Sequence, residues 1–376
     1  MKIGKFKLKH YINYFAIGIL TAVLGGIVLS GGRLDSSTLF LLEKIAISII
    51  LAVSLSLVVG FLGELSLGHA GFMCVGAYIG GKVSSLLVPT MGNGVEAFLI
   101  SLVIGAAAAA VCGIIIGIPA LRLRGDYLAI VTLAFGEIVK SLFQNSSDES
   151  FGGALGLNTP RFDKRYLFII AFVLVLVTLA VVQNLMRSKH GRAITAIRDN
   201  EIAARSTGIN VTKYKLLAFT LSAMFAGVAG VLYSYSNYTV QSMKFGYNYS
   251  IEILVMVVLG GMGSINGSII AAALITFLNA ELATILTGDL AVLQNLLYAL
   301  ILIVIVIYNN APALKGFRDK YSISALIEKF RKNNDPANVK DDKAKWDVVP
   351  TKISMDEILS VDLTPHDKNY GNGGDE

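Results

Sequence analysis

Long apolar runs with almost no charge alternate with short polar segments along most of the chain. A helix needs about 20 mostly apolar residues to cross a bilayer. The pattern therefore predicts an all-α polytopic membrane protein with about ten transmembrane helices. The predicted spans cover approximately residues 12–30, 39–62, 68–88, 96–119, 127–143, 166–186, 214–235, 249–263, 267–286 and 290–308.

Glycines interrupt this pattern in two places, where we expect broken or re-entrant helices. The sequence GELSLGHAG (63–71) separates the second and third spans, and GGMGSING (260–267) separates the eighth and ninth. The free backbone groups of a broken helix can line a solute site. Close packing of small residues between helices is the alternative reading, and the sequence leaves both open.

Composition excludes a soluble domain, because 54% of the 376 residues are apolar and only 15% are charged, against about 25% charged in soluble domains. Lys and Arg gather in segments that ten spans would place on one side, which the positive-inside rule predicts to be cytoplasmic. We therefore expect a basic cytoplasmic N-terminus (1–11), a transmembrane domain (12–310) with a cytoplasmic loop (187–215), and a polar, disordered cytoplasmic tail (311–376).

Polar and ionisable side chains inside the predicted spans or at the two interruptions between them are the candidates for a substrate pathway. Charge at membrane depth is costly, so such residues usually face a cavity or a partner. Hydrogen bonding to neighbouring helices is the alternative role. The predicted pathway residues are Glu64, Ser66, His69, Glu137, Ser264 and Asn266.

The 187–215 loop is long, basic and itself helical in pattern. A weak apolar stripe is formed by Ala193, Ile194, Ile197, Ile202 and Ala204. We predict a single short helix in the 192–208 stretch. Asp199 is its predicted N-cap, and Gly208 is its predicted C-terminal stop. Such a helix could be a rigid contact for a partner or a segment bound to anionic lipid.

No segment has the spacing of a nucleotide or metal site. Residues 76–83 match GxxxxGK[ST] except at Val83, which lacks the hydroxyl that magnesium needs. Cys74 and Cys112 lie in apolar runs without disulfide or metal spacing. We expect no metal, cofactor or catalytic residue in this chain, so any ATP would be handled by another subunit.

Four blocks in order, at 63–81, 121–139, 191–233 and 260–274, resemble the permease subunits of branched-chain amino acid ABC importers of the Liv type. The resemblance covers about 12–310, and RLRGDY with the long loop is more similar to the M-type than to the H-type permease. It implies a transport subunit, not an enzyme, that moves branched-chain amino acids across the plasma membrane by alternating access.

The resemblance also implies partners. These are a second related permease, two cytoplasmic ATPases that use ATP and magnesium, an extracytoplasmic solute-binding protein and membrane lipid, with no nucleic acid. The loop is similar to the EAA-type segment that contacts the ATPase, although Ile202 interrupts the simplest form of that motif. The residues implied in coupling are Arg192, Arg198, Asp199, Glu201, Ala203, Ala204 and Gly208.

Alternative functions remain. Related systems carry urea or short amides, so the substrate class is open between these and amino acids. An ion-coupled secondary transporter would use Glu64, His69 or Glu137 as a protonated group. An intramembrane enzyme built on Glu64 and His69 lacks a third ligand or a nucleophile at a sensible spacing.

Overall fold

The computed structural model describes residues 35–285, apart from 93, 124, 161 and 163, together with 18, 21, 26, 299, 300 and 303. The chain divides into two compact units, Met1–Val306 and Ile307–Glu376, and every described residue belongs to the first. The predicted N-terminus (1–11) and tail (311–376) lie outside the described residues. So do the predicted first and last spans, except at the isolated positions.

The described part is almost entirely helical, as the apolar runs predict. Each predicted span between residues 39 and 286 coincides with a helix, and most limits agree within a few residues. The long helices are α2 (Ser36–Ser56), which continues as the π-helix η2 (Leu57–Leu62), α3 (His69–Met91), α4 (Val95–Ala120), α5 (Asp126–Gln144), α7 (Lys164–Arg187), α10 (Val211–Asn237), α11 (Tyr247–Leu259) and α12 (Ile265–Ile285).

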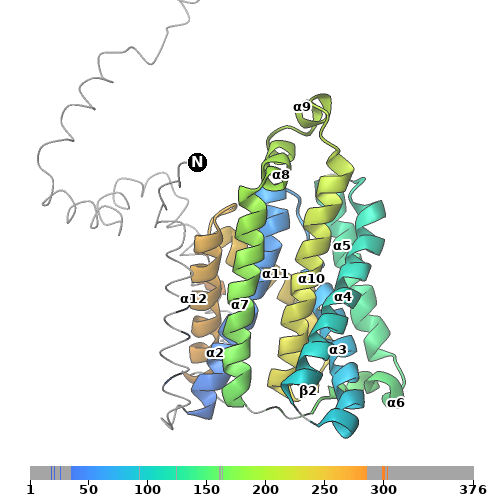
Figure 1. The fold of residues 1–376 in the computed structure, drawn as a ribbon, viewed down its shortest axis with the longest axis vertical. Coiled ribbons are helices and arrows are strands. Elements are labelled where there is room, and N and C mark those ends of the chain that lie inside the picture. The colour runs from blue at the N-terminus through green and yellow to red at the C-terminus, as the bar shows by residue number, and fades with distance from the viewer. Residues whose placement is uncertain are drawn as a thin grey trace, which may run out of the picture. The chain divides into compact units, whose positions relative to one another are not determined.

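Shorter elements join these helices. They are α6 (Asp148–Phe151), the 3₁₀ turns η3 (Gly153–Leu155) and η4 (Ser242–Phe245), α8 (Lys189–Asp199), α9 (Glu201–Ser206), and the strands β1 (Leu157–Asn158) and β2 (Thr239–Val240). The two strands pair antiparallel, with Leu157 opposite Val240. Figure 1 shows α8 and α9 at one end of the helices and α6 and β2 at the other.

Six helices of the described residues are long and apolar enough to cross a membrane. They are α2 with η2, α3, α4, α7, α10 and α12. The helix α11 has only 13 residues, and α5 carries Asp126, Glu137 and Lys140. The chain thus forms a multi-pass helical membrane domain.

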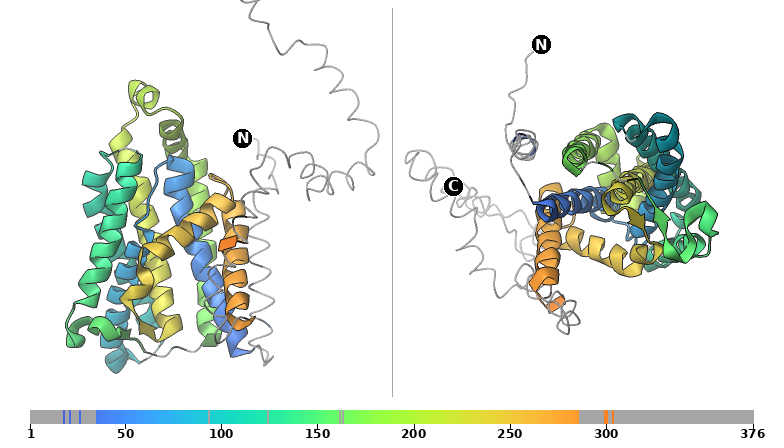
Figure 2. Two further views of the ribbon diagram at one scale, coloured as in Figure 1. Left: turned by 180° about the vertical axis from the view of Figure 1, so that it is seen from behind. Right: turned by 90° about the horizontal axis from the view of Figure 1, so that it is seen from below.

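The helix α10 packs against α2, α3 and α4, and α2 also packs against α7 and α12 (Figures 1 and 2). Small residues allow this close approach, as is common between membrane helices. A Cβ at Gly227 of α10 would lie 2.5 Å from Ala109 of α4. On the outer surface of α4, by contrast, Val103 and Ile115 are more than half exposed, as expected for a lipid-facing helix.

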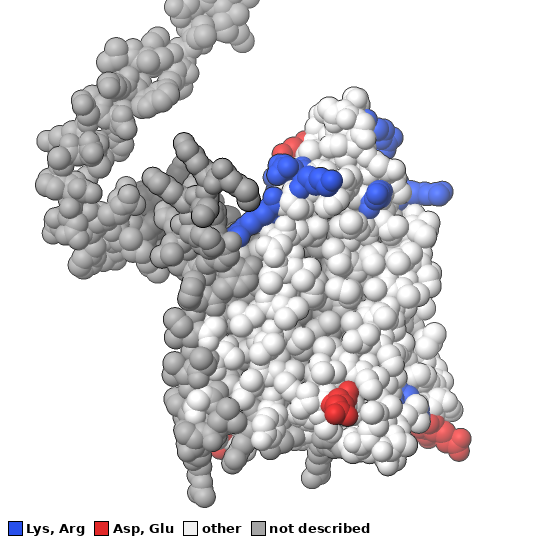
Figure 3. Space-filling view, viewed as in Figure 1, with Lys and Arg blue, Asp and Glu red and all other residues white. Residues whose placement is uncertain are grey.

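Charge is distributed unequally between the two ends. On the face drawn in Figure 3, Lys and Arg gather around α8 and α9, while the surface between the ends is nearly free of charge. We call the end that carries α8 and α9 the basic end. Exposed cations on and beside α8 and α9 include Arg187, Lys189, Arg192, Arg198, Arg205 and Lys213.

Both predicted glycine interruptions are present, and η2, which precedes the first, packs against the second. The first is the segment 63–68 between η2 and α3, which begins with Gly63 at φ 79°. The second is the segment 260–264 between α11 and α12. A Cβ at Gly60 would lie 2.6 Å from the Gly263 nitrogen, and one at Gly267 would collide with the Gly260 backbone. Close packing of small residues therefore accounts for Gly60, Gly260 and Gly267.

Candidate functional site

The 187–215 connection forms two helices, not the single predicted one. Asn200 is extended (φ −158°, ψ 105°) and separates α8 from α9. Its Oδ1 accepts hydrogen bonds from the backbone N–H of Ile202 and Ala203, both at 3.0 Å. Asp199 is the last residue of α8, so its prediction as an N-cap is wrong. The N-cap of α9 is the next residue, Asn200, through its side-chain amide oxygen.

Gly208 ends α9 as predicted. Its φ is 85°, and it donates its N–H to the Arg205 carbonyl, while Ile209 donates to the Ala204 carbonyl. This pair of bonds is the Schellman arrangement, which favours glycine at the left-handed position. Of the predicted stripe, Ala193, Ile194, Ile197 and Ala204 are buried. The prediction that Ile202 belongs to this buried stripe is wrong, because Ile202 is 72% exposed on α9.

A buried lysine joins these helices to the first interruption. Lys215, in the second turn of α10, places its Nζ 2.5 Å from Oε1 of Glu64 and 3.3 Å from Oε2 of Glu201. The Lys215 side chain is only 5% exposed. Glu201 also pairs with Arg205, at 3.1 Å. Glu64 follows Gly63 directly, so Lys215 near the start of α10 binds both the carboxylate of the 63–68 segment and the carboxylate in the first turn of α9.

A second bond joins α8 to η2. Arg198 donates from Nη1 to the Gly60 carbonyl at 3.1 Å, and its Nε and Nη2 both bind Asp199. A π-helix leaves its backbone carbonyls out of the usual α register, so they are available to such donors. We call Gly60, Glu64, Arg198, Glu201 and Lys215 the coupling cluster.

The other predicted pathway residues do not gather at one point. His69 is buried at the start of α3, with its Nε2 2.9 Å from Ser54 Oγ. Glu137 accepts from Lys140 Nζ at 2.6 Å and from the Tyr247 backbone N–H at 2.8 Å, which places it at the first residue of α11.

The remaining three residues of the prediction lie at the interruptions themselves. Ser66 is buried within the 63–68 segment. Ser264 accepts a hydrogen bond from the Gly267 N–H at the start of α12, and Asn266 is exposed in the first turn of that helix. None of the six predicted pathway residues lines the cavity formed by α2, α10, η4, α11 and α12.

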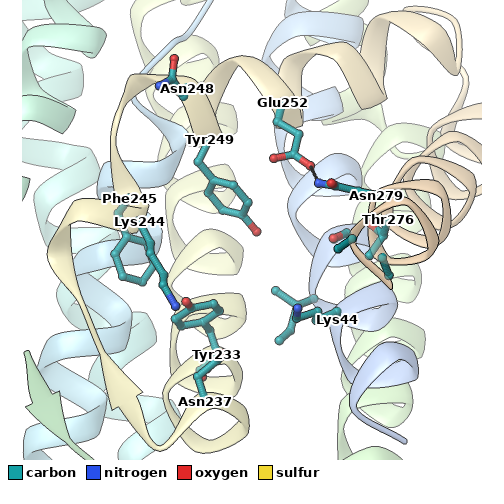
Figure 4. Close-up of a pocket in the computed structure, with 14 residues that line it drawn as sticks. Lys44, Tyr233, Asn237, Lys244, Phe245, Asn248, Tyr249, Glu252, Thr276 and Asn279 are labelled. Carbon is teal, nitrogen blue, oxygen red and sulfur yellow. Dashed lines mark hydrogen bonds between the residues drawn. The ribbon is translucent and has the colours of Figure 1, made fainter. Parts of the chain in front are cut away.

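That cavity has a volume of about 510 Å³ and lies between α2, α10, η4, α11 and α12. It belongs to the half of the bundle farther from α8 and α9, because Asn237 is the last residue of α10 and Ala283 lies near the end of α12. Figure 4 shows Lys44, Lys244, Tyr249 and Glu252 around the opening. The floor is apolar and includes buried Ile47 and Phe245.

Sequence reasoning missed the three charged residues of this cavity. Lys44 and Glu252 lie inside predicted spans, and an ionisable residue at membrane depth is a default candidate for function. The glycines around Glu64 and His69 give those two residues a stronger local signal. Lys244 lies in a short connection and carries no local signal.

The apolar helices, basic end, interrupted helices and polar cavity define an all-α membrane protein of the transporter class. Residues 37–307 match the family described as "Branched-chain amino acid transport system / permease component", and the chain belongs to this family. The sequence-based resemblance to Liv-type permeases is thereby confirmed.

Similar proteins include the high-affinity branched-chain amino acid transport system permease protein LivM of Escherichia coli, 37% identical over 71% of this chain and 68% of its own length. LivM of Salmonella typhimurium is 36% identical over 68% of this chain and 65% of its own length. The ribose import permease protein RbsC of Escherichia coli is 28% identical over 79% of this chain and 92% of its own length. No solved structure matches the chain significantly.

Proposed function

We propose that this chain is one permease subunit of an ABC importer and moves branched-chain amino acids by alternating access. A second related permease would complete the pathway, and two cytoplasmic ATPases would hydrolyse ATP. A solute-binding protein outside the cell would deliver the amino acid. The coupling cluster is the observation that carries this proposal.

The two helices of the basic end have the properties of an ATPase contact. Caps fix them at Ser188, Asn200 and Gly208, so that they can move as rigid bodies. Ile202 and Ala203 are exposed on α9, at the end where the positive-inside rule places the cytoplasm. An exposed isoleucine among charged residues is suited to the centre of a protein contact.

Movement of α8 and α9 would be transmitted to the cavity through residues of η2 and of the segment that follows α11, which are in direct contact. Arg198 holds the Gly60 carbonyl, and a Cβ at Gly263 would lie 3.5 Å from its Nη1. Gly263 follows α11, whose first two turns supply Tyr249 and Glu252 to the cavity. A shift at α8 would therefore act on α11 and alter access to the cavity.

The arrangement favours ATP-driven coupling over ion coupling. Glu64 is paired with Lys215, and Glu137 with Lys140. His69 is hydrogen-bonded within the core. None of these three residues lines the cavity, so none of them is placed to couple an ion to a solute there; the carboxylate that does line it is Glu252.

The test is docking of the ATPase on α9. Ile202→Asp places a charge in the proposed contact and should abolish ATPase co-purification and ATP-driven leucine uptake in proteoliposomes of the complete importer. Ile202→Leu should preserve both. The matched control is Thr212→Asp, also exposed but on α10, which should behave like the wild type. Wild-type association and uptake in Ile202→Asp would refute docking on α9.

A further inference from the structure

The cavity between α2, α10, η4, α11 and α12 contains charges of both signs that lack an ion-pair partner. Lys44, Lys244 and Glu252 all line it. Among the described residues none of the three is within ion-pair distance of an opposite charge, although Lys44 is close enough to sense both others electrostatically. Lys44 and Lys244 are exposed and Glu252 is partly buried, so water can compensate these charges, and a ligand of complementary charge can replace that water.

We propose that this cavity binds the head group of a free α-amino acid, an inference that rests on the proposed transport function. Lys44 and Lys244 bind the α-carboxylate, and Glu252 binds the α-ammonium group. Charge-assisted hydrogen bonds of this kind are the stronger ones in proteins. A zwitterion supplies both missing charges at once, which no neutral or singly charged solute does.

Neighbouring side chains hold the charged groups in place. Asn279 of α12 donates from Nδ2 to Glu252 Oε1 at 3.2 Å, which leaves the other carboxylate oxygen for the ligand. Glu252 thereby joins α11 to α12. The Lys44 Nζ lies 4.4 Å from the centre of the Phe40 ring, one turn earlier on α2. In Figure 4 the Tyr249 ring also extends from α11 into the cavity.

The apolar floor suits a branched aliphatic side chain. Ile47 and Phe245 are 3% and 1% exposed, and Ala280 and Ala283 of α12 leave room opposite them. A volume of about 510 Å³ lies within the range of small-molecule sites, about 300–1,000 Å³. Charge at one side and apolar surface at the other match leucine, isoleucine and valine.

The same charges discriminate against the other candidate solutes. Urea, a short amide or a sugar is neutral, so its entry would displace water from Lys44, Lys244 and Glu252 without compensating them. Lys44 and Lys244 are exposed and Glu252 is partly buried, so removing their water without supplying a partner costs the desolvation free energy of each charge. The cavity is therefore selective for a zwitterion, and this selectivity belongs to the permease itself as well as to any binding protein.

The experiment uses photo-leucine, a diazirine analogue that retains both α-groups, with the permease–ATPase complex in nanodiscs and no binding protein. After illumination, mass spectrometry should place the label on peptides that contain Ile47, Phe245 or Ala283. Leucine should compete. Leucinamide, which lacks the carboxylate, 4-methylpentanoate, which lacks the ammonium group, and urea should not.

Variants assign the two groups of the ligand. Lys44→Met with Lys244→Met should lower labelling about tenfold, as expected for a lost charged hydrogen bond, and should let leucinamide compete as well as leucine. Glu252→Gln should instead improve competition by 4-methylpentanoate relative to leucine. Lys82→Met is the matched control, because its Nζ binds the Glu149 carbonyl outside the cavity.

Three results would overturn the inference: no label in the cavity, equal competition by urea, or a co-purified phospholipid that blocks labelling until it is removed. If leucine is transported but the cavity is not labelled, the inference fails and the proposed function stands. If the cavity is labelled but Ile202→Asp leaves ATPase docking intact, the docking proposal fails and the inference stands.

Discussion

The basic end and the cavity half of the bundle differ in whether their charged residues form ion pairs and in how closely their residues pack. At the basic end, buried Lys215 is held by two carboxylates, and close glycine contacts join η2 to the second interruption and that interruption to α12. In the cavity half, Lys44, Lys244 and Glu252 surround open volume without forming ion pairs among the described residues. The same helices, α2, α10, α11 and α12, run through both regions.

This difference separates two kinds of polar residue in a membrane protein. A charge with an oppositely charged internal partner fixes one element on another and can transmit movement, whereas a charge without one remains available for a ligand. Ionisable residues found from sequence must therefore be sorted by their partners before a role is assigned. Substitutions matched between the two regions test that distinction.

The largest effect is expected from glycine at the packed interruptions. Gly267→Ala places a Cβ into the Gly260 backbone, so α11 and α12 must separate. Overpacking of this kind should cost about 3 kcal/mol. The thermal unfolding midpoint and the membrane level of the protein should both fall.

Gly136→Ala provides the control, because the added Cβ finds its nearest neighbour at 3.7 Å, an ordinary contact. It should leave the unfolding midpoint unchanged or raise it slightly, since alanine favours the helix. Equal midpoints for Gly267→Ala and the wild type would show that the interruptions are not tightly packed.

The second prediction compares one lysine from each region. Lys215→Met leaves Glu64 and Glu201 without their buried partner, and because these carboxylates are 12% and 21% exposed the cost should be about 2 kcal/mol, below that of a fully buried pair. Lys44→Met removes a charge that has no ion-pair partner and should change stability by less than about 0.5 kcal/mol. Unfolding midpoints of the two purified variants measure the difference.

A double variant identifies the cause. Adding Glu64→Gln to Lys215→Met removes the orphaned carboxylate and should recover part of the lost stability. Lys213→Met, on the exposed side of the same turn, should have no effect. If Lys44→Met proves as damaging as Lys215→Met, the cavity lysine has a structural role and the comparison fails.

Sequence alone was sufficient to predict the long helices between residues 39 and 285 and the two interruptions among them. Apolar runs of membrane length and paired glycines are local signals, and the described residues follow them from 39 to 285. Gly208 was found for the same reason, because a helix stop is local chemistry. The division at Asn200 was missed, because Asp and Asn both cap helices and the sequence around 199 and 200 permits either.

The candidate sites could be predicted only in part, because they depend on distant partners. Glu64 and Lys215 are 151 residues apart, and no pattern in either segment indicates that they meet. The cavity draws its charged residues from α2, η4 and α11, and their arrangement follows from the packing of α10 and α12 around them. The predicted pathway role of Glu64, Ser66, His69, Glu137, Ser264 and Asn266 stays a prediction.

The smallest effect is expected where strain is local and the surroundings are open. Gly208 has φ 85°, and a Cβ added there would have no atom within 4 Å, so Gly208→Val costs only the left-handed conformation, about 1–2 kcal/mol. That strain should distort the end of α9 and leave the helical bundle intact. Leucine-stimulated ATP hydrolysis in proteoliposomes should fall, while the unfolding midpoint of the permease stays close to that of the wild type.

Gly92 is a second glycine with a positive φ and open surroundings, at the opposite end of the molecule. It follows α3 with φ 77°, and it too has no neighbour within 4 Å of an added Cβ. At φ 77° and ψ 172° Gly92 has a conformation that is nearly restricted to glycine, so Gly92→Val introduces at least as much backbone strain far from α9 and should leave stimulated hydrolysis unchanged. Gly208→Asn should be milder than Gly208→Val, because asparagine tolerates the left-handed region. If Gly92→Val and Gly208→Val reduce hydrolysis equally, the defect reflects general strain, and α9 has no special part in coupling.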